Sequence, residues 1–285
     1  MGKAKSMDPK DLVVGGVLQT VEAMTLGMPF EVWKTHMGTY RKTGTMEAFN
    51  IIYSKGGVGA FWSGWQAKAV ESFLKGGVLM FSKEAIIRGC KSMGSSDLSA
   101  GLVGGFGGGV AQVVVVGPCT YLVTASVTGD KSISLGTRIA QTYQRSGIGG
   151  FYKGGTALML RQGSNWASRQ GLTDAIREYM KSRRAHQFGG DTKRVQLSTL
   201  EEATAGIIGG ALSTWNQPFE VMRIEAQAAG AKGLPSMNIV QTARHIVSES
   251  GVQGLFQGIM PRMGLCIWQT LFMVTVPYLL KPYGI

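Results

Sequence analysis

Charged side chains are scarce in this sequence. Asp, Glu, Lys and Arg make up 16% of its 285 residues, well below the share of about 25% in an average soluble protein. Clean apolar runs of about 20 residues are also missing, so a bundle of simple lipid-bathed helices is not expected. Helices that each turn one polar face toward an aqueous cavity fit the composition better.

Cysteine and histidine are few, with three of each. Cys90, Cys119 and Cys266 are scattered without the spacing of metal ligands, so we expect three reduced, buried thiols. No nucleophile or metal-ligand cluster accompanies the acidic residues. The sequence therefore predicts no catalytic residue, no metal and no cofactor, and an enzyme is not expected.

Acidic residues are outnumbered by basic ones, 17 to 29, which gives a net charge of +12. Such a surface favours anionic partners: acidic lipid headgroups, nucleic acid or small anions. The segment "KSRRAHQFGGDTKR" at 181–194 is read as a polar linker, and its basic residues support a hypothesis of DNA binding. Binding to the anionic phospholipids of a membrane explains the same charge.

Three internal repeats organise the chain. A proline that follows a Gly-rich apolar segment is itself followed, after 35, 36 and 40 residues, by a glycine that closes a glycine-aromatic cluster. The three pairs are Pro29 with Gly64, Pro118 with Gly154, and Pro218 with Gly258. The repeats are placed at about 10–94, 95–190 and 195–285.

Each repeat predicts the same order of helices. A long helix runs through the proline, which kinks it because proline removes a hydrogen bond; these helices are placed at 11–37, 98–127 and 198–227. A short amphipathic helix follows, in "TMEAFNIIYS", "LGTRIAQTYQRS" and "NIVQTARHIVSES". A second long helix comes last, at 65–90, 155–182 and 259–281. The predicted fold is thus all-α, with six transmembrane and three short helices.

The Gly-rich patches "GGVLQT", "GLVGGFGGG" and "AGIIGGA" lie inside these apolar helices. A phosphate-binding loop would need a preceding strand and a "GK[ST]" sequence, and neither is present. Small residues that let helices approach closely explain the patches better.

With its three units, the chain resembles the mitochondrial carrier family, whose members repeat P-x-[DE]-x-x-[KR] before a glycine-aromatic motif. "PFEVWK" and "PFEVMR" match this pattern with Pro29 and Pro218. The resemblance covers essentially the whole chain. It implies a pseudo-threefold helix bundle in the mitochondrial inner membrane that works as a monomer, binds cardiolipin and opens a central site alternately to each side.

The resemblance also implies two gates of charged residues. In the family, the acid of one kinked helix pairs with the base of the next at the matrix side, which here involves Glu31, Lys34, Glu220 and Arg223. The second repeat has Thr120 and Val123 instead, so only Glu220 with Lys34 is expected as a full pair. The cytoplasmic gate maps onto Glu84, Asp174, Arg177 and Lys281, with pairs Glu84–Arg177 and Asp174–Lys281.

A polar stripe marks the candidate binding site. Arg161, Asn165 and Arg169 are four residues apart, so they share one face of a helix, and charges within a membrane usually face a cavity. Guanidinium groups bind carboxylates bidentately. The remaining candidates from the same stripe and from the helices at 65–90 and 259–281 are Lys68, Glu71, Lys75, Gln162, Arg262 and Gln269.

Two acids complicate this cationic site. Glu71 either pairs with Lys75 one turn on or binds a proton together with the anion, and Glu22 is a second buried acid; both otherwise neutralise cavity arginines. The run "RQGSN" resembles the site of tricarboxylate-transporting members of the family, although Leu265 stands where those members have an arginine. The function implied is antiport of citrate for 2-oxoglutarate, with DNA binding as the alternative.

Overall fold

The computed structural model describes residues 9–130, 133–188, 196–235 and 237–280, and these residues form helices and their connections. The first repeat holds a broken helix, α1 (Pro9–Glu22), η1 (Ala23–Gly27) and α2 (Met28–Thr39). Its short helix is α3 (Thr45–Ser54), and a turn η2 (Val58–Trp62) leads into α4 (Trp65–Ser92).

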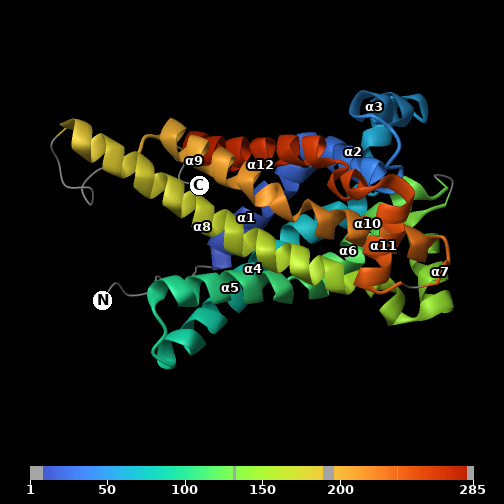
Figure 1. Ribbon diagram of the computed structural model, residues 1–285, viewed down its shortest axis with the longest axis horizontal. Coiled ribbons are helices and arrows are strands. Elements are labelled where there is room, and N and C mark those ends of the chain that lie inside the picture. Colours follow the sequence, from blue (N-terminus) through green and yellow to red (C-terminus); the bar gives the residue numbers. More distant parts are fainter. Residues whose placement is uncertain (1–8, 131–132, 189–195, 236, 281–285) are drawn as a thin grey trace.

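The other two repeats follow the same order. The second comprises α5 (Asp97–Ala111), α6 (Val113–Thr128), α7 (Leu135–Ser146), η3 (Ile148–Tyr152) and α8 (Gly155–Phe188). The third comprises α9 (Thr199–Leu212), η5 (Ser213–Asn216), α10 (Gln217–Ala231), α11 (Ile239–Ser250), η6 (Val252–Phe256) and α12 (Ile259–Leu280). In Figure 1 the long helices run along the bundle, and α3, α7 and α11 gather at one end. The predicted all-α fold with three tandem repeats is confirmed.

The kink precedes each proline. Thr25, four residues before Pro29, has non-helical angles (φ −82°, ψ −116°), and α5 and α6 meet at a bend of 49° ahead of Pro118. The proline ring clashes with the carbonyl four residues earlier, whereas proline itself is tolerated in the first helical turn. Pro29 and Pro218 accordingly stand in the first turns of α2 and α10.

Aromatic side chains of the glycine-aromatic clusters bind carbonyls at these kinks. The Tyr152 hydroxyl donates to the Val114 carbonyl at 2.8 Å, which is the carbonyl that Pro118 cannot pair. The Trp62 indole N–H donates to the Met24 carbonyl at 2.7 Å, ahead of Pro29. The clusters of the first two repeats therefore compensate the kinks of their own repeats, which matters because lipid offers no hydrogen bonds to a bare carbonyl.

The three motif glycines join each repeat to the next. Gly64, Gly154 and Gly258 all have positive φ, between 74° and 83°, which glycine adopts without strain. A Cβ at Gly64 would lie 3.0 Å from Val123 Cα, and one at Gly258 would lie 3.0 Å from the Lys34 carbonyl oxygen. The last repeat thus packs against the first, and the bundle closes into a ring.

Glycines of the apolar helices serve close packing, as predicted. A Cβ at Gly109 of α5 would lie 2.6 Å from the Gln162 carbonyl oxygen of α8, and one at Gly209 would meet the backbone of Thr173 at 3.0 Å. Two helical stretches, Val13–Thr39 and Val252–Pro277, are long and apolar enough to cross a membrane. The bent pair α5–α6 meets the same criteria when its two helices are taken as one span.

The predicted linker at 181–194 is wrong in its first part, because residues up to Phe188 continue α8. Arg184 there donates to Glu201 at 2.7 Å, and the Arg183 guanidinium lies over the Tyr179 ring. The rest of the segment, 189–195, and Lys281 lie outside the described residues. DNA binding stays a prediction.

Candidate functional site

A cavity of about 390 Å³ lies between the helices of the bundle. It is lined by polar side chains from all three repeats, among them Gln19 and Glu22 of α1 and Thr270 of α12. All nine residues predicted for the binding site line it, namely Lys68, Glu71, Lys75, Arg161, Gln162, Asn165, Arg169, Arg262 and Gln269.

Glu220 is the centre of the charge network that closes one end of this cavity. The Glu220 carboxylate is fully buried and lies 2.6 Å from Lys34 Nζ, 2.9 Å from Arg223 Nη2 and 3.2 Å from Arg161 Nε. The structure thus brings together Glu220 and Lys34, as the sequence predicts. We call this group, with Glu31, Lys68 and Glu71, the gate network.

Lys68 supplies the cation that the second repeat lacks. Glu31 lies 2.8 Å from Lys34 Nζ and 3.6 Å from Lys68 Nζ, whereas the position expected to carry its base is Val123. Lys68 also lies 3.1 Å from Glu71. Of the alternatives for Glu71, the pair with Lys75 is not formed: Glu71 pairs with the lysine one turn earlier, which helix geometry allows equally well.

Gln227 takes the place of the acid missing at Thr120. The Arg223 guanidinium donates to Gln227 Oε1 at 2.5 Å, and the Gln227 amide donates to Thr120 Oγ1 at 3.0 Å. Thr124 also donates to Gln227 Oε1, at 3.0 Å. The sequence analysis missed Gln227, although its position four residues after Arg223 places the two on one helix face.

Arg262 and Asn165 are held within the wall of the cavity. The buried Arg262 guanidinium donates to Gln217 Oε1 at 2.9 Å, to Asn165 Oδ1 at 3.3 Å and to Asn216 Oδ1. These amide oxygens satisfy the hydrogen-bond donors of the guanidinium group without neutralising its positive charge. Arg262 therefore orients Asn165 and adds positive potential.

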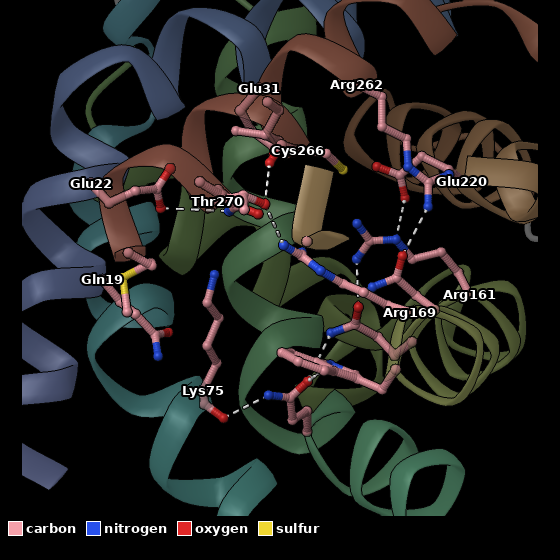
Figure 2. A pocket seen from close by; sticks show the side chains of 18 of the residues that line it. Gln19, Glu22, Glu31, Lys75, Arg161, Arg169, Glu220, Arg262, Cys266 and Thr270 are labelled. Carbon is pink, nitrogen blue, oxygen red and sulfur yellow. Dashed lines mark hydrogen bonds and ion pairs between the residues drawn. The ribbon is translucent and has the colours of Figure 1, made fainter. Parts of the chain in front are cut away.

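Lys75, Arg169 and Arg262 are the cavity cations that have no described carboxylate within ion-pair distance, and of these Arg262 is held by amide oxygens in the wall. Arg169 Nη2 donates to Thr270 Oγ1 at 3.1 Å, and the Lys75 ammonium has neither an ion pair nor a hydrogen bond to a described residue. Figure 2 shows Lys75 extended into the cavity and the Arg169 guanidinium reaching into the same open region. Arg161 points there too, but Glu220 already neutralises it.

Gln112 is a second residue that the sequence analysis missed. It stands at the bend between α5 and α6, where its amide donates to the Lys75 carbonyl at 2.6 Å. Its Oε1 accepts from the Trp166 indole at 2.8 Å. The sequence could have indicated this residue, because Gln112 is a lone polar residue in the apolar run "GGGVAQVVVVG".

At the opposite end the predicted pair Glu84–Arg177 is not formed, and the predicted pair Asp174–Lys281 involves a residue outside the described ranges. Glu84 pairs with Arg88 on its own helix at 2.6 Å. Arg177 pairs with Asp174 at 3.1 Å and with Glu202 of α9 at 2.7 Å. Glu84 and Arg177 thus hold partners other than each other, while Glu220 and Lys34 at the other end are paired.

Comparison with known proteins agrees with this architecture. The family model "Mitochondrial carrier protein" matches residues 7–93 and 195–283. The chain is 36% identical to the citrate/oxoglutarate carrier protein of Saccharomyces cerevisiae over 282 residues, which covers 95% of this chain and 88% of that protein. It is 26% identical to the human mitochondrial tricarboxylate transport protein, over 92% of this chain and 86% of the human one.

A third relative, the mitochondrial substrate carrier family protein Z of Dictyostelium discoideum, is 30% identical over 89% of this chain and 85% of its own length. Sequence, fold and cavity lead to the same conclusion: the chain belongs to the mitochondrial carrier family and is a multi-pass protein of the mitochondrial inner membrane.

Proposed function

We propose that this carrier exchanges citrate for 2-oxoglutarate across the inner membrane by alternating access. The observation that carries the proposal is that Lys75 and Arg169 reach into one cavity between the helices without a described carboxylate at ion-pair distance. A carboxylate ligand would supply the direct ion-pair partner that these two cations lack, although the acids Glu22 and Glu71 line the same cavity. The names of the yeast and human relatives support a citrate-type substrate.

Arg161 links substrate binding to the gate. Its Nε lies 3.2 Å from Glu220, yet the pair lacks hydrogen-bond geometry, and its guanidinium borders the cavity. A third carboxylate on the substrate competes with Glu220 for Arg161. This competition weakens the gate network, whose net contribution is modest because desolvation offsets much of the Coulomb attraction.

The charged residues at the two ends of the cavity account for alternating access. The gate network is closed here, and we assign this end to the matrix. Opening it releases Glu31, Lys34, Glu220 and Arg223, and closing the other end brings Glu84 toward Arg177. Substrate binding energy drives the exchange between these two arrangements.

Proteoliposomes test the proposal. We expect purified protein, reconstituted in cardiolipin-containing liposomes loaded with 2-oxoglutarate, to take up labelled citrate, and unloaded liposomes to take up little. Arg169→Gln should abolish this uptake while the protein stays folded. The proposal fails if the loaded liposomes exchange another solute but no citrate.

A further inference from the structure

An amide side chain stands at the bend between the two halves of the second kinked helix. Gln112 lies between α5 and α6, where the helix axis turns by 49°, and it is fully buried although it borders the central cavity. A buried amide needs partners for its N–H groups and for its carbonyl oxygen. The partners of Gln112 come from α4 of the first repeat and from α8 of the second, so this residue connects three helices.

The neighbours of Gln112 fix the orientation of its amide group. The Trp166 indole N–H can only donate, and it donates to Gln112 Oε1 at 2.8 Å. The Lys75 backbone carbonyl can only accept, and it accepts from Gln112 Nε2 at 2.6 Å (Figure 2). Turning the amide over would place N–H against N–H and oxygen against oxygen. The side chain therefore has one favourable arrangement in this wall.

Gln162 extends the same series of hydrogen bonds to a cavity arginine. Its Nε2 donates to Gln112 Oε1 at 3.3 Å, and its Oε1 accepts from Arg161 Nη1 at 2.5 Å. A guanidinium can only donate, so the orientation of this second amide is fixed as well. We call Gln112 and Gln162 the amide pair. Through it, hydrogen bonds run without interruption from the Lys75 carbonyl to the Arg161 guanidinium.

The residues at the two ends of the amide pair both present a cation to the cavity (Figure 2). Lys75 belongs to α4 and Arg161 to α8, and both helices pack on α5. The separation of the two cations therefore depends on how α4 and α8 are held across α5. A binding group keeps its position when buried hydrogen bonds behind it lock the side chains and backbone that carry it. Gln112 supplies such bonds to both helices.

We propose that Gln112 is a positioning residue that sets the substrate selectivity of the cavity. The proposal rests on the exchange of citrate for 2-oxoglutarate proposed above. Citrate carries three carboxylates on a branched chain, and it engages Lys75, Arg161 and Arg169 together only while these cations keep a fixed spacing. 2-Oxoglutarate carries two carboxylates, so it needs two of the three cations and tolerates a change in their separation. Loss of the amide pair therefore weakens citrate binding more than 2-oxoglutarate binding.

Transport kinetics with both substrates test this role. Gln112→Met replaces the amide by an apolar chain of similar length and interrupts the amide pair. In liposomes loaded with 2-oxoglutarate, we expect the KM for labelled citrate to rise about tenfold and that for labelled 2-oxoglutarate less than about threefold, because misplaced binding groups cost most where all are used. A variant that had only lost stability would lower the amount of active protein and leave both KM values unchanged.

Trp166→Phe is a milder variant that decides the question if Gln112→Met does not fold. It keeps an aromatic ring in place and removes only the donor that orients Gln112. We expect the ratio of the two KM values to shift in the same direction by a smaller factor. Combined with Gln112→Met, it should cause no further shift, because the amide pair is already interrupted.

Gln253→Met, at an exposed glutamine of η6, is the matched control and should keep both KM values. The proposal is overturned if the KM values of Gln112→Met, or of Trp166→Phe where that variant decides, change by equal factors or not at all. It is also overturned if Gln253→Met shifts their ratio as far. An unmodified protein that exchanges 2-oxoglutarate but takes up no citrate would contradict the proposed function itself, which distinguishes the two failures.

Discussion

Lys34 Nζ lies 2.6 Å from Glu220 Oε1, and each side chain is at most 1% exposed. This contact joins α2 of the first repeat to α10 of the third. Glu220 also pairs with Arg223 and Arg161, whereas Glu31 is the only other acid that pairs with Lys34 among the described residues. Glu220 therefore has more ion-pair partners than Lys34, and substituting each residue in turn distinguishes their contributions to stability.

We expect Glu220→Gln to destabilise the closed state by about 3–5 kcal/mol, because it leaves buried cations without their carboxylate. Lys34→Met should cost less, since Glu220 keeps two arginines and Glu31 keeps Lys68. Thermal unfolding of both variants checks the order. An equal or inverted order would show that Glu220 is not the centre of the network.

Substitution of the unpaired cations should affect transport and not folding. Lys75→Gln and Arg169→Gln each remove a charge that no described carboxylate balances, so we expect a loss of citrate uptake of tenfold or more, about 1.4 kcal/mol or more, with the Tm unchanged or raised. Arg244→Gln, at an exposed arginine of α11, is the matched control. Normal uptake by both cavity variants would place the substrate elsewhere.

The second gate is testable by cross-linking. In this structure Glu84 and Arg177 pair with other residues, and alternating access requires them to meet in the other state. In a protein freed of Cys90, Cys119 and Cys266, we expect Glu84→Cys with Arg177→Cys to cross-link during turnover and to block exchange. Reduction should restore it. Cross-linking that leaves exchange intact would contradict the gate.

The hydrogen bond at the second kink should stabilise the protein. Tyr152→Phe removes the donor to the Val114 carbonyl, and we expect a loss of about 0.5–1.5 kcal/mol. Trp62→Phe makes the equivalent change in the first repeat. Unfolding measurements with both variants should give similar losses. No loss in either would mean that another group satisfies these carbonyls.

The sequence by itself determined the order of the helices, the position of their kinks and nine of the residues that line the cavity. Motif spacing repeats three times, and helical periodicity assigns Arg161, Asn165 and Arg169 to one face without knowledge of the neighbours. Capping and proline chemistry act within a few residues, so the short helices and kinks were predicted close to where they lie.

Only the tertiary structure decided which charges meet. Glu71 had lysines three residues before it and four after it, and both are within reach on a helix. Its pairing with Lys68 depends on Glu31, which approaches the same lysine from α2. Likewise, Arg138, Arg145 and Lys153 of the second repeat line one small cavity together with Gly230 of the third. Such contacts depend on the distance between helices, and no local pattern encodes that distance.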